Sequence, residues 1–516
     1  MKAFLKFLVL LIICATSFAC SEKENSVAYY ENSQFSERSF KLGKKLQNPY
    51  SVENMKKAYL ALDIKTRLDV DKPIDDIVYP THAYVKFKFG SREDLERIER
   101  DTTLELYPYP LDYEILEEGC MPENYDSCGY RYASVPIDYA VPDSVNCELV
   151  EELFIPDDGD TVYTRSGCNL TSDFIEALVD KSLELTGNSG PDELSTRGKS
   201  SWNPSGIITA YDNATNSYIP LHRVKVRARR WFTTHKAYTN EYGYYRCASF
   251  KRPANYSVVW EGAEWDTRFG WFGQAIYNGP KKQGDWNLAI NQSMHKTLAA
   301  SVVHRVANRY YNGNIGGLAR PMNLRKEKIC ILNKDGRSDY WGNIGMGALP
   351  DIRIYIKDGN NYRKTPSIFA TVSHELGHVS HCTLITKIKY WQVSDIIVES
   401  WANFVSWAFL QLEYDALNAN VSTYIAQRAK QSWPANNVEK EYSSLFVDLV
   451  DNYNQGAYDA TLPFDEVYGF SYSTLNMLLL LSKDMESLKE NLKIWKPSFI
   501  SNVQIDKLFE CYENNY

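Results

Sequence analysis

The segment from Thr365 to Val379 constrains the fold more than any other part of the chain. Thr365 can cap a helix and Pro366 suits its first turn. The apolar residues that follow recur at helical spacing, at Ile368, Phe369, Val372, Leu376 and Val379. Within this helix lies His374-Glu375-Leu376-Gly377-His378, and two histidines four residues apart share one helical face. The segment therefore predicts an amphipathic helix whose two imidazoles converge on one point.

Two imidazoles at this spacing are typical of a zinc site. Both can reach one Zn²⁺ at about 2.0–2.1 Å, and Glu375, turned about 100° around the helix, can reach a metal-bound water. The pattern alone has three fixed positions and also occurs by chance. The residues around the pattern therefore decide whether it indicates a zinc site.

A second apolar helix follows, begun by Ser394 or Asp395. Glu399 is its only carboxylate before Glu413, among aromatic and aliphatic residues. Burying a lone acid is costly unless a cation compensates its charge, and zinc is such a cation. The alternative is that Glu399 faces solvent.

At this point the sequence resembles the gluzincin superfamily of zinc metallopeptidases, whose pattern is HExxH followed by a glutamate on a neighbouring helix. The resemblance implies His374 and His378 as histidine ligands, Glu399 as third ligand and Glu375 as general base. Asn403 stands where some gluzincins place an aspartate that orients the first histidine. His381 lies about 10 Å along the helix from His374, too far to bind the same ion. The third histidine of the metzincin pattern is absent.

The resemblance also implies a mechanism, in which Glu375 takes a proton from zinc-bound water and passes it to the leaving amine of a cleaved peptide bond. No histidine follows His381, so we expect a tyrosine to stabilise the oxyanion. Tyr468 is the candidate, because it precedes an apolar segment as the catalytic tyrosine of aminopeptidase-like gluzincins does, and Tyr472 is the alternative. The strand expected at residues 352–357 has an edge that suits an extended peptide or protein substrate.

The first residues form a targeting segment, with Lys2 and Lys6 ahead of an apolar run. Residues 1–19 are expected to be a signal peptide. The end of this segment resembles a bacterial lipobox with Cys20 as the lipidated residue, and the charged residues after it resemble the export signals of Bacteroidetes surface lipoproteins. This implies an outer membrane or cell surface lipoprotein that meets the membrane through an N-terminal lipid. The alternative is a plain secretory signal cut near Ala19.

Length and charge limit the remaining possibilities. A chain of 516 residues is too long for one ordinary domain. Its net charge of −8 is spread without a long basic run, so no nucleic acid partner is expected. The mature chain keeps eight cysteines, an even number in an oxidising compartment, and we expect disulfides, with Cys120, Cys128, Cys147 and Cys168 pairing among themselves.

The pattern of elements predicts a multidomain α+β fold. Residues 20–195 form an N-terminal accessory α+β domain, with a strand at 82–89, a helix at 91–100 and a strand at 103–107, followed by a polar linker. Residues 200–270 resemble a small β-sandwich of the prealbumin or regulatory type. Residues 280–516 are expected to be a mainly α, zincin-like metallopeptidase domain with a small sheet.

One strand of the expected sandwich carries a basic stripe of Lys225, Arg227, Arg229 and Arg230. We favour the interpretation that this stripe is the solvated face of a sheet.

The competing functional hypothesis is a non-catalytic surface lipoprotein. In it, an adhesin or a glycan- or protein-binding module keeps a vestigial or structural zinc site. The sandwich and the N-terminal region, which carries no catalytic motif, favour this hypothesis. Glu375 counts against it, because a structural site does not need a general base.

Overall fold

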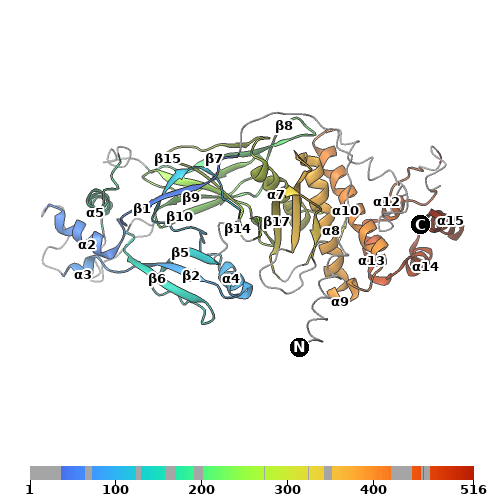
Figure 1. The fold of residues 1–516 in the computed structure, drawn as a ribbon, viewed down its shortest axis with the longest axis horizontal. Helices are drawn as coiled ribbons and strands as arrows, with labels where there is room; N and C mark the ends of the chain where they lie inside the picture. Colours follow the sequence, from blue (N-terminus) through green and yellow to red (C-terminus); the bar gives the residue numbers. More distant parts are fainter. Residues whose placement is uncertain are drawn as a thin grey trace.

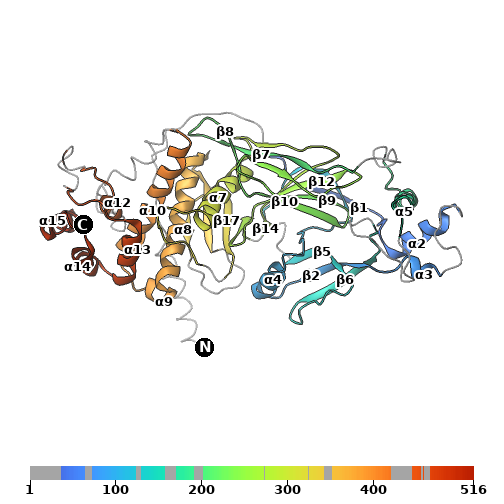
Figure 2. The same cartoon turned by 180° about the vertical axis from the view of Figure 1, so that it is seen from behind.

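The computed structural model describes residues 37–63, 73–123, 129–156, 170–190, 201–271, 273–322, 325–341, 351–419, 444–454, 457 and 465–515. The expected signal segment and Cys20 lie outside these ranges. The chain is a multidomain α+β protein, and the molecule is elongated, with α2 near one end and α15 near the other (Figures 1 and 2).

The N-terminal region combines short helices with two small antiparallel sheets. The first sheet pairs β1 (Lys41–Lys45) with β3 (Tyr113–Glu117), and the second has the order β5 (Tyr130–Pro136), β2 (His82–Lys88), β6 (Asn146–Leu153). The helices are α2 (Val52–Ala61), α3 (Ile74–Ile77), α4 (Arg92–Glu99) and α5 (Ser172–Leu185). The Ser91 hydroxyl caps α4 by accepting from the Asp94 amide. The predicted strand at 82–89 and helix at 91–100 are confirmed.

The predicted strand at 103–107 is absent. Among these residues only Tyr107 forms a bridge, to Tyr132. The Leu106 carbonyl accepts from the Arg227 guanidinium instead (3.0 Å).

The middle of the chain forms two sheets. One has the order β10 (Thr233–Tyr238), β9 (Lys225–Arg230), β12 (Ala254–Val259), β15 (Ile276–Lys282), β4 (Gly119–Cys120), all antiparallel. The other places β7 (Ser205–Asp212) between β11 (Tyr244–Arg246) and β16 (Leu288–Ile290), with β8 (Ser217–Pro220) also paired to β7. The strand expected to carry Lys225, Arg227, Arg229 and Arg230 is confirmed as β9.

The basic stripe on β9 is buried, so our interpretation of it as a solvated face was wrong. Lys225, Arg227, Arg229 and Arg230 are 8%, 1%, 4% and 5% exposed. Lys225 lies 3.0 Å from both Glu105 and Glu261, and the Arg227 guanidinium lies 4.1 Å from the centre of the Tyr107 ring. Residues of the N-terminal region thus cover this face and compensate its charges.

The C-terminal region is a mixed sheet with helices beside it. The sheet has the order β14 (Gly273–Gln274), β13 (Trp265–Phe269), β17 (Glu327–Asp335), β19 (Ile352–Asp358), β18 (Asp339–Tyr340), and β20 (Asn361–Tyr362) also pairs with β19. The helices are α7 (His295–Asn312), α8 (Thr365–Ile385), α9 (Lys387–Tyr390), α10 (Asp395–Ala416), α12 (Leu445–Asp448), α13 (Tyr472–Leu481), α14 (Met485–Trp495) and α15 (Asn502–Asn515).

Several strands cross between the regions that we expected from the sequence. β4 of the N-terminal region pairs with β15, and β13 pairs in parallel with β17 of the C-terminal sheet. The carboxylate of Glu37 accepts from the amides of Lys296 (2.9 Å) and Thr297 (3.0 Å) and so caps α7. One hydrophobic core accordingly contains residues from Phe40 to Tyr512.

The described cysteines do not bear out the expected disulfides. No disulfide joins any two of Cys120, Cys147, Cys247, Cys330, Cys382 and Cys511, while Cys128 and Cys168 lie outside the described residues. In the described ranges, no helix combines the length and apolar character needed to cross a bilayer.

Candidate metal centre

Helix α8 is held at its first residue by a distant turn. The amide of Thr365 donates to Asn213 Oδ1 (2.9 Å), and the Thr365 hydroxyl accepts from the Asn213 amide (2.8 Å). Pro366 follows in the first turn, where a missing N–H costs nothing. The helix continues for 21 residues and is buried over nearly its whole length. Its two histidines, His374 and His378, are 1% and 4% exposed.

Helix α10 runs antiparallel to α8. Trp401 lies against Ser380, Asn403 against His374, and the Ser406 hydroxyl donates to the Ala370 carbonyl. At Gly377 the two helices approach so closely that a Cβ would lie 3.1 Å from both Ala402 Cα and Val405 Cβ.

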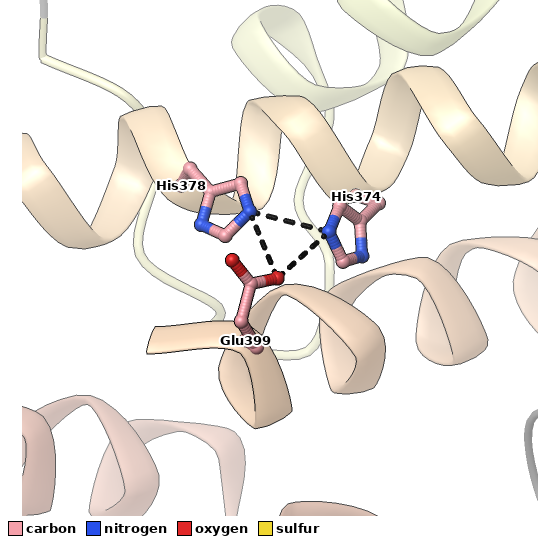
Figure 3. Close-up of side chains that lie close together, drawn as sticks. All are labelled: His374, His378 and Glu399. Carbon is pink, nitrogen blue, oxygen red and sulfur yellow. Dashed lines mark hydrogen bonds and ion pairs between the residues drawn. The ribbon is translucent and has the colours of Figure 1, made fainter. Parts of the chain in front are cut away.

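This packing brings Glu399 of α10 between the two imidazoles of α8, as Figure 3 shows. The Nε2 atoms of His374 and His378 lie 3.2 Å apart, and they lie 3.3 and 3.4 Å from Glu399 Oε2. Zinc bonds of about 2.0–2.1 Å at tetrahedral angles separate the ligand atoms by about 3.3–3.4 Å. The three atoms therefore have the spacing of three ligands of a tetrahedral zinc ion.

Each imidazole has a partner on its other nitrogen. His374 Nδ1 lies 3.1 Å from Asn403 Oδ1, and His378 Nδ1 lies 3.1 Å from the Tyr390 hydroxyl. An amide oxygen can only accept, so Nδ1 of His374 carries the proton and its Nε2 keeps a lone pair towards Glu399. The Tyr390 hydroxyl can donate or accept, so it can accept from the same tautomer of His378. Both rings are thus oriented to present Nε2 to a cation.

The electrostatics of Glu399 are those of a ligand carboxylate. The residue is 7% exposed. Burial by itself raises its pKa, but protonated His378 and His374 imidazoles, through their charge and their hydrogen bonds, outweigh burial and hold the pKa well below its usual range. A cation bound between the three side chains would replace these protons and keep Glu399 ionised in the same way.

Glu375 follows His374 on α8 and is 1% exposed. Next to the ligand residues lies a cavity of about 30 Å³, lined by His378 and Glu399 together with Tyr340, Tyr390, Trp391, Val393, Asp395 and Val398. Burial and the nearby Glu399 raise the pKa of Asp395.

The structure brings His374, His378, Glu399 and Asn403 together. The contacts of Tyr468 lie elsewhere: its ring packs on Phe499 (5.2 Å) and is 42% exposed. Tyr472 packs on Phe404 of α10 (5.2 Å). Neither tyrosine lines the cavity next to Glu399.

His381 is not part of the ligand triangle. It is fully buried against the Tyr390 ring (5.2 Å), and burial lowers its pKa to about 3. The edge of β19 proposed for substrate is occupied at both ends, by β18 at Ile352 and Arg353 and by β20 at Lys357 and Asp358.

Sequence reasoning missed two tyrosines of the centre. Tyr390 ends the short helix α9, and the Tyr340 ring is stacked against His378 at 6.3 Å. No motif spacing links either residue to the histidines. It also missed the anchor of α10, where Arg305 of α7 bridges Asp212 (2.9 Å) and Glu413 (2.8 Å).

The sequence matches no protein-family model. No curated protein matches it either.

Proposed function

We propose that this chain is a zinc-dependent peptidase whose metal is held by His374, His378 and Glu399. The observation that carries the proposal is the triangle of ligand atoms, with edges of 3.2 to 3.4 Å and a hydrogen-bond partner behind each imidazole. The order of these residues along two antiparallel helices supports a gluzincin-like arrangement. In this proposal residues 280–516 are a zincin-like domain and residues 200–270 a prealbumin-like sandwich.

Glu375 distinguishes a catalytic centre from a structural one. Zinc bound there would act as a Lewis acid that lowers the pKa of a coordinated water and polarises a peptide carbonyl. Glu375 removes the proton from the attacking water and delivers it to the amine that leaves. Asn403 and Tyr390 hold the imidazoles in the required tautomer throughout.

The oxyanion donor in the proposal is a tyrosine, and the sequence favours Tyr468 over Tyr472. Tyr340 is a third candidate because it lines the cavity beside His378 and Glu399. Removing one oxyanion donor costs about 10² to 10³ in turnover. Single Tyr→Phe variants at the three positions identify the donor, since a variant that keeps full turnover excludes its residue.

The proposed setting is the outer membrane or cell surface, with the protein anchored through a lipid on Cys20. The substrate class is a peptide or protein. The lipobox-like end of the N-terminal segment supports the anchor, and the substrate class follows from the resemblance to metallopeptidases.

The decisive experiment combines metal analysis with digestion of an unbiased peptide library. We expect one zinc per chain, retained in Glu375→Gln and lost in His378→Ala, with His295→Ala as a control on another helix. Amide and carboxylate are nearly isosteric, so Glu375→Gln keeps zinc while cleavage falls by about 10² to 10⁴. A Glu375→Gln protein that holds zinc and cleaves like the parent would refute the mechanism. A parent that holds zinc and cleaves nothing would favour a binding module.

A further inference from the structure

A second group of candidate ligands lies in the C-terminal helical part, apart from the zinc centre. Asp448, Asp451 and Asp465 each offer a carboxylate oxygen, and these oxygens all lie within 4.8 Å of one another. Asp448 is fully buried, Asp465 is 5% exposed and Asp451 is half-buried. We call these three residues the aspartate cluster.

Polar contacts from other parts of the fold hold the aspartate cluster in position. The Tyr512 hydroxyl of α15 donates to Asp448 Oδ2 (2.6 Å), and Asn454 Oδ1 accepts from the Asp465 amide (3.1 Å). The other oxygen of Asp448, Oδ1, is inaccessible to solvent and has no hydrogen-bond partner among the described residues. A buried carboxylate oxygen without a partner has lost its hydrogen bonds to water and has gained none in the protein, so it indicates a ligand at this position.

No cation compensates these charges in the described part of the chain. Apart from burial, the groups that act on the three carboxylates are one another, Glu466, the Tyr512 hydroxyl and two backbone amides. Burial and the neighbouring acids raise the pKa of Asp465 to about 8. Three carboxylates this close are costly to ionise together unless a cation joins them.

We infer that the aspartate cluster binds a calcium ion. Calcium prefers six to eight oxygen ligands at about 2.3–2.6 Å, so oxygens on opposite sides of one ion lie about 4.6–5.2 Å apart. The three carboxylate oxygens, all within 4.8 Å of one another, are close enough to share such an ion. Every donor in the cluster is a hard oxygen, without the imidazole or thiolate that favours zinc. Asn452 and Glu466 line a cavity together with Asp465 and offer further oxygens.

The position of the aspartate cluster gives the ion a structural role. Asp448 is the last residue of α12, and Phe446 of the same helix packs on Trp401 (5.6 Å) and Phe404 (6.4 Å) of α10. Helix α10 carries Glu399. Calcium bound there joins the end of α12 to Asp451 and Asp465, while the Tyr512 hydroxyl links Asp448 to α15.

The test uses the full chain, stripped of metals, reloaded with zinc and then titrated with calcium. We expect one calcium per chain by elemental analysis. Because calcium binds the folded form, about 2 mM calcium raises Tm by about 2–5 °C. Asp451→Asn and Asp465→Asn weaken calcium binding by about 100-fold or more and remove the shift, with zinc content unchanged. Glu510→Gln, at an exposed acid of α15, is the matched control, and it should keep both the calcium-dependent Tm shift and the zinc content of the parent.

A terbium titration tests the same site without any variant, because Tyr512 lies close enough to sensitise terbium emission that calcium then quenches. Parent protein that retains no calcium, or calcium bound equally by the Asp451→Asn/Asp465→Asn double variant, would overturn the inference. Magnesium that gives the same Tm shift and displaces terbium equally well would overturn the assignment to calcium. Zinc content and peptide cleavage report on the other centre, so the two proposals fail separately.

Discussion

In the proposed zinc centre, the hydrogen bond between His374 and Asn403 contributes to the affinity for the metal. Asn403 Oδ1 accepts from Nδ1 of His374 at 3.1 Å, and an amide oxygen is a weaker acceptor than a carboxylate. Asn403→Asp keeps the shape and adds the charge, whereas Asn403→Leu removes the acceptor.

The expected changes in zinc affinity follow from replacing a hydrogen bond to a neutral amide by one to a charged carboxylate. A bond to a charged group contributes about 1.5–3 kcal/mol and a neutral one about 0.5–1.5 kcal/mol, so Asn403→Asp gains about 1 kcal/mol, or about fivefold tighter zinc binding. Because Asn403 is only half-buried, solvent limits the cost of the new charge. Asn403→Leu leaves the ring without orientation, and such losses weaken metal affinity by about 10- to 100-fold.

The assay is a zinc titration against a chelating dye, with Gln411→Leu on the same helix as the control for nonspecific change in α10. The expected order of affinity is Asn403→Asp, then parent and Gln411→Leu together, then Asn403→Leu. If Asn403→Asp and Asn403→Leu both bind zinc as the parent does, the contact does not orient the ring and the reasoning fails.

Three further predictions address packing, pH and anchoring. In Gly377→Ala the new Cβ pushes α8 and α10 apart, and the free energy of unfolding is expected to fall by about 1–3 kcal/mol. Denaturant unfolding measures this change, and zinc binding should weaken as well. An unchanged free energy of unfolding would contradict the close approach of the two helices. Burial raises the pKa of Glu261, but Lys225 and Lys326 hold it well below the usual range of a glutamate, so its contribution to stability is fully present above that range and is lost as pH falls from there through the lower pKa of the folded state. Unfolding measured down the acid range should be less pH-dependent in Glu261→Gln than in the parent, and equal slopes would argue against these ion pairs. Cys20→Ser should release the protein from membranes, and unchanged membrane fractionation of that variant would count against lipidation.

The helices of the metal centre were predictable because their signals are local. Apolar spacing set α8 and α10, and the lone acid among aromatic residues singled out Glu399. Asn403 lies four residues after Glu399, so the two side chains share a face of α10. Tyr390 had no such signal, because the chain leaves α8 at Thr386 with a positive φ and begins a separate short helix.

The burial of the β9 stripe was not predictable for a related reason. Alternation along one strand identifies its two faces, but it does not say whether another segment covers the charged one. Here the covering residues come from far away in the chain: Leu106 accepts from Arg227 across 121 positions. The basic side chains of β9, which the local pattern suggested are solvated, are therefore compensated by residues that no local pattern identifies.

The N-terminal region makes contacts with elements that lie much later in the chain, and this limits the order in which parts of the fold can form. Glu37 caps a helix whose capped amides lie 259 and 260 positions downstream, and β4 can pair with its strand partner β15 only after residues 277 and 278 have been made. Contacts so far apart in sequence form slowly, and the cap of α7 by Glu37 cannot be complete before the chain has been synthesised to residue 297. During synthesis, Glu37 and β4 therefore lack these partners until the later segments have been made, although the sheets β1–β3 and β5–β2–β6 can already form from residues of the N-terminal region.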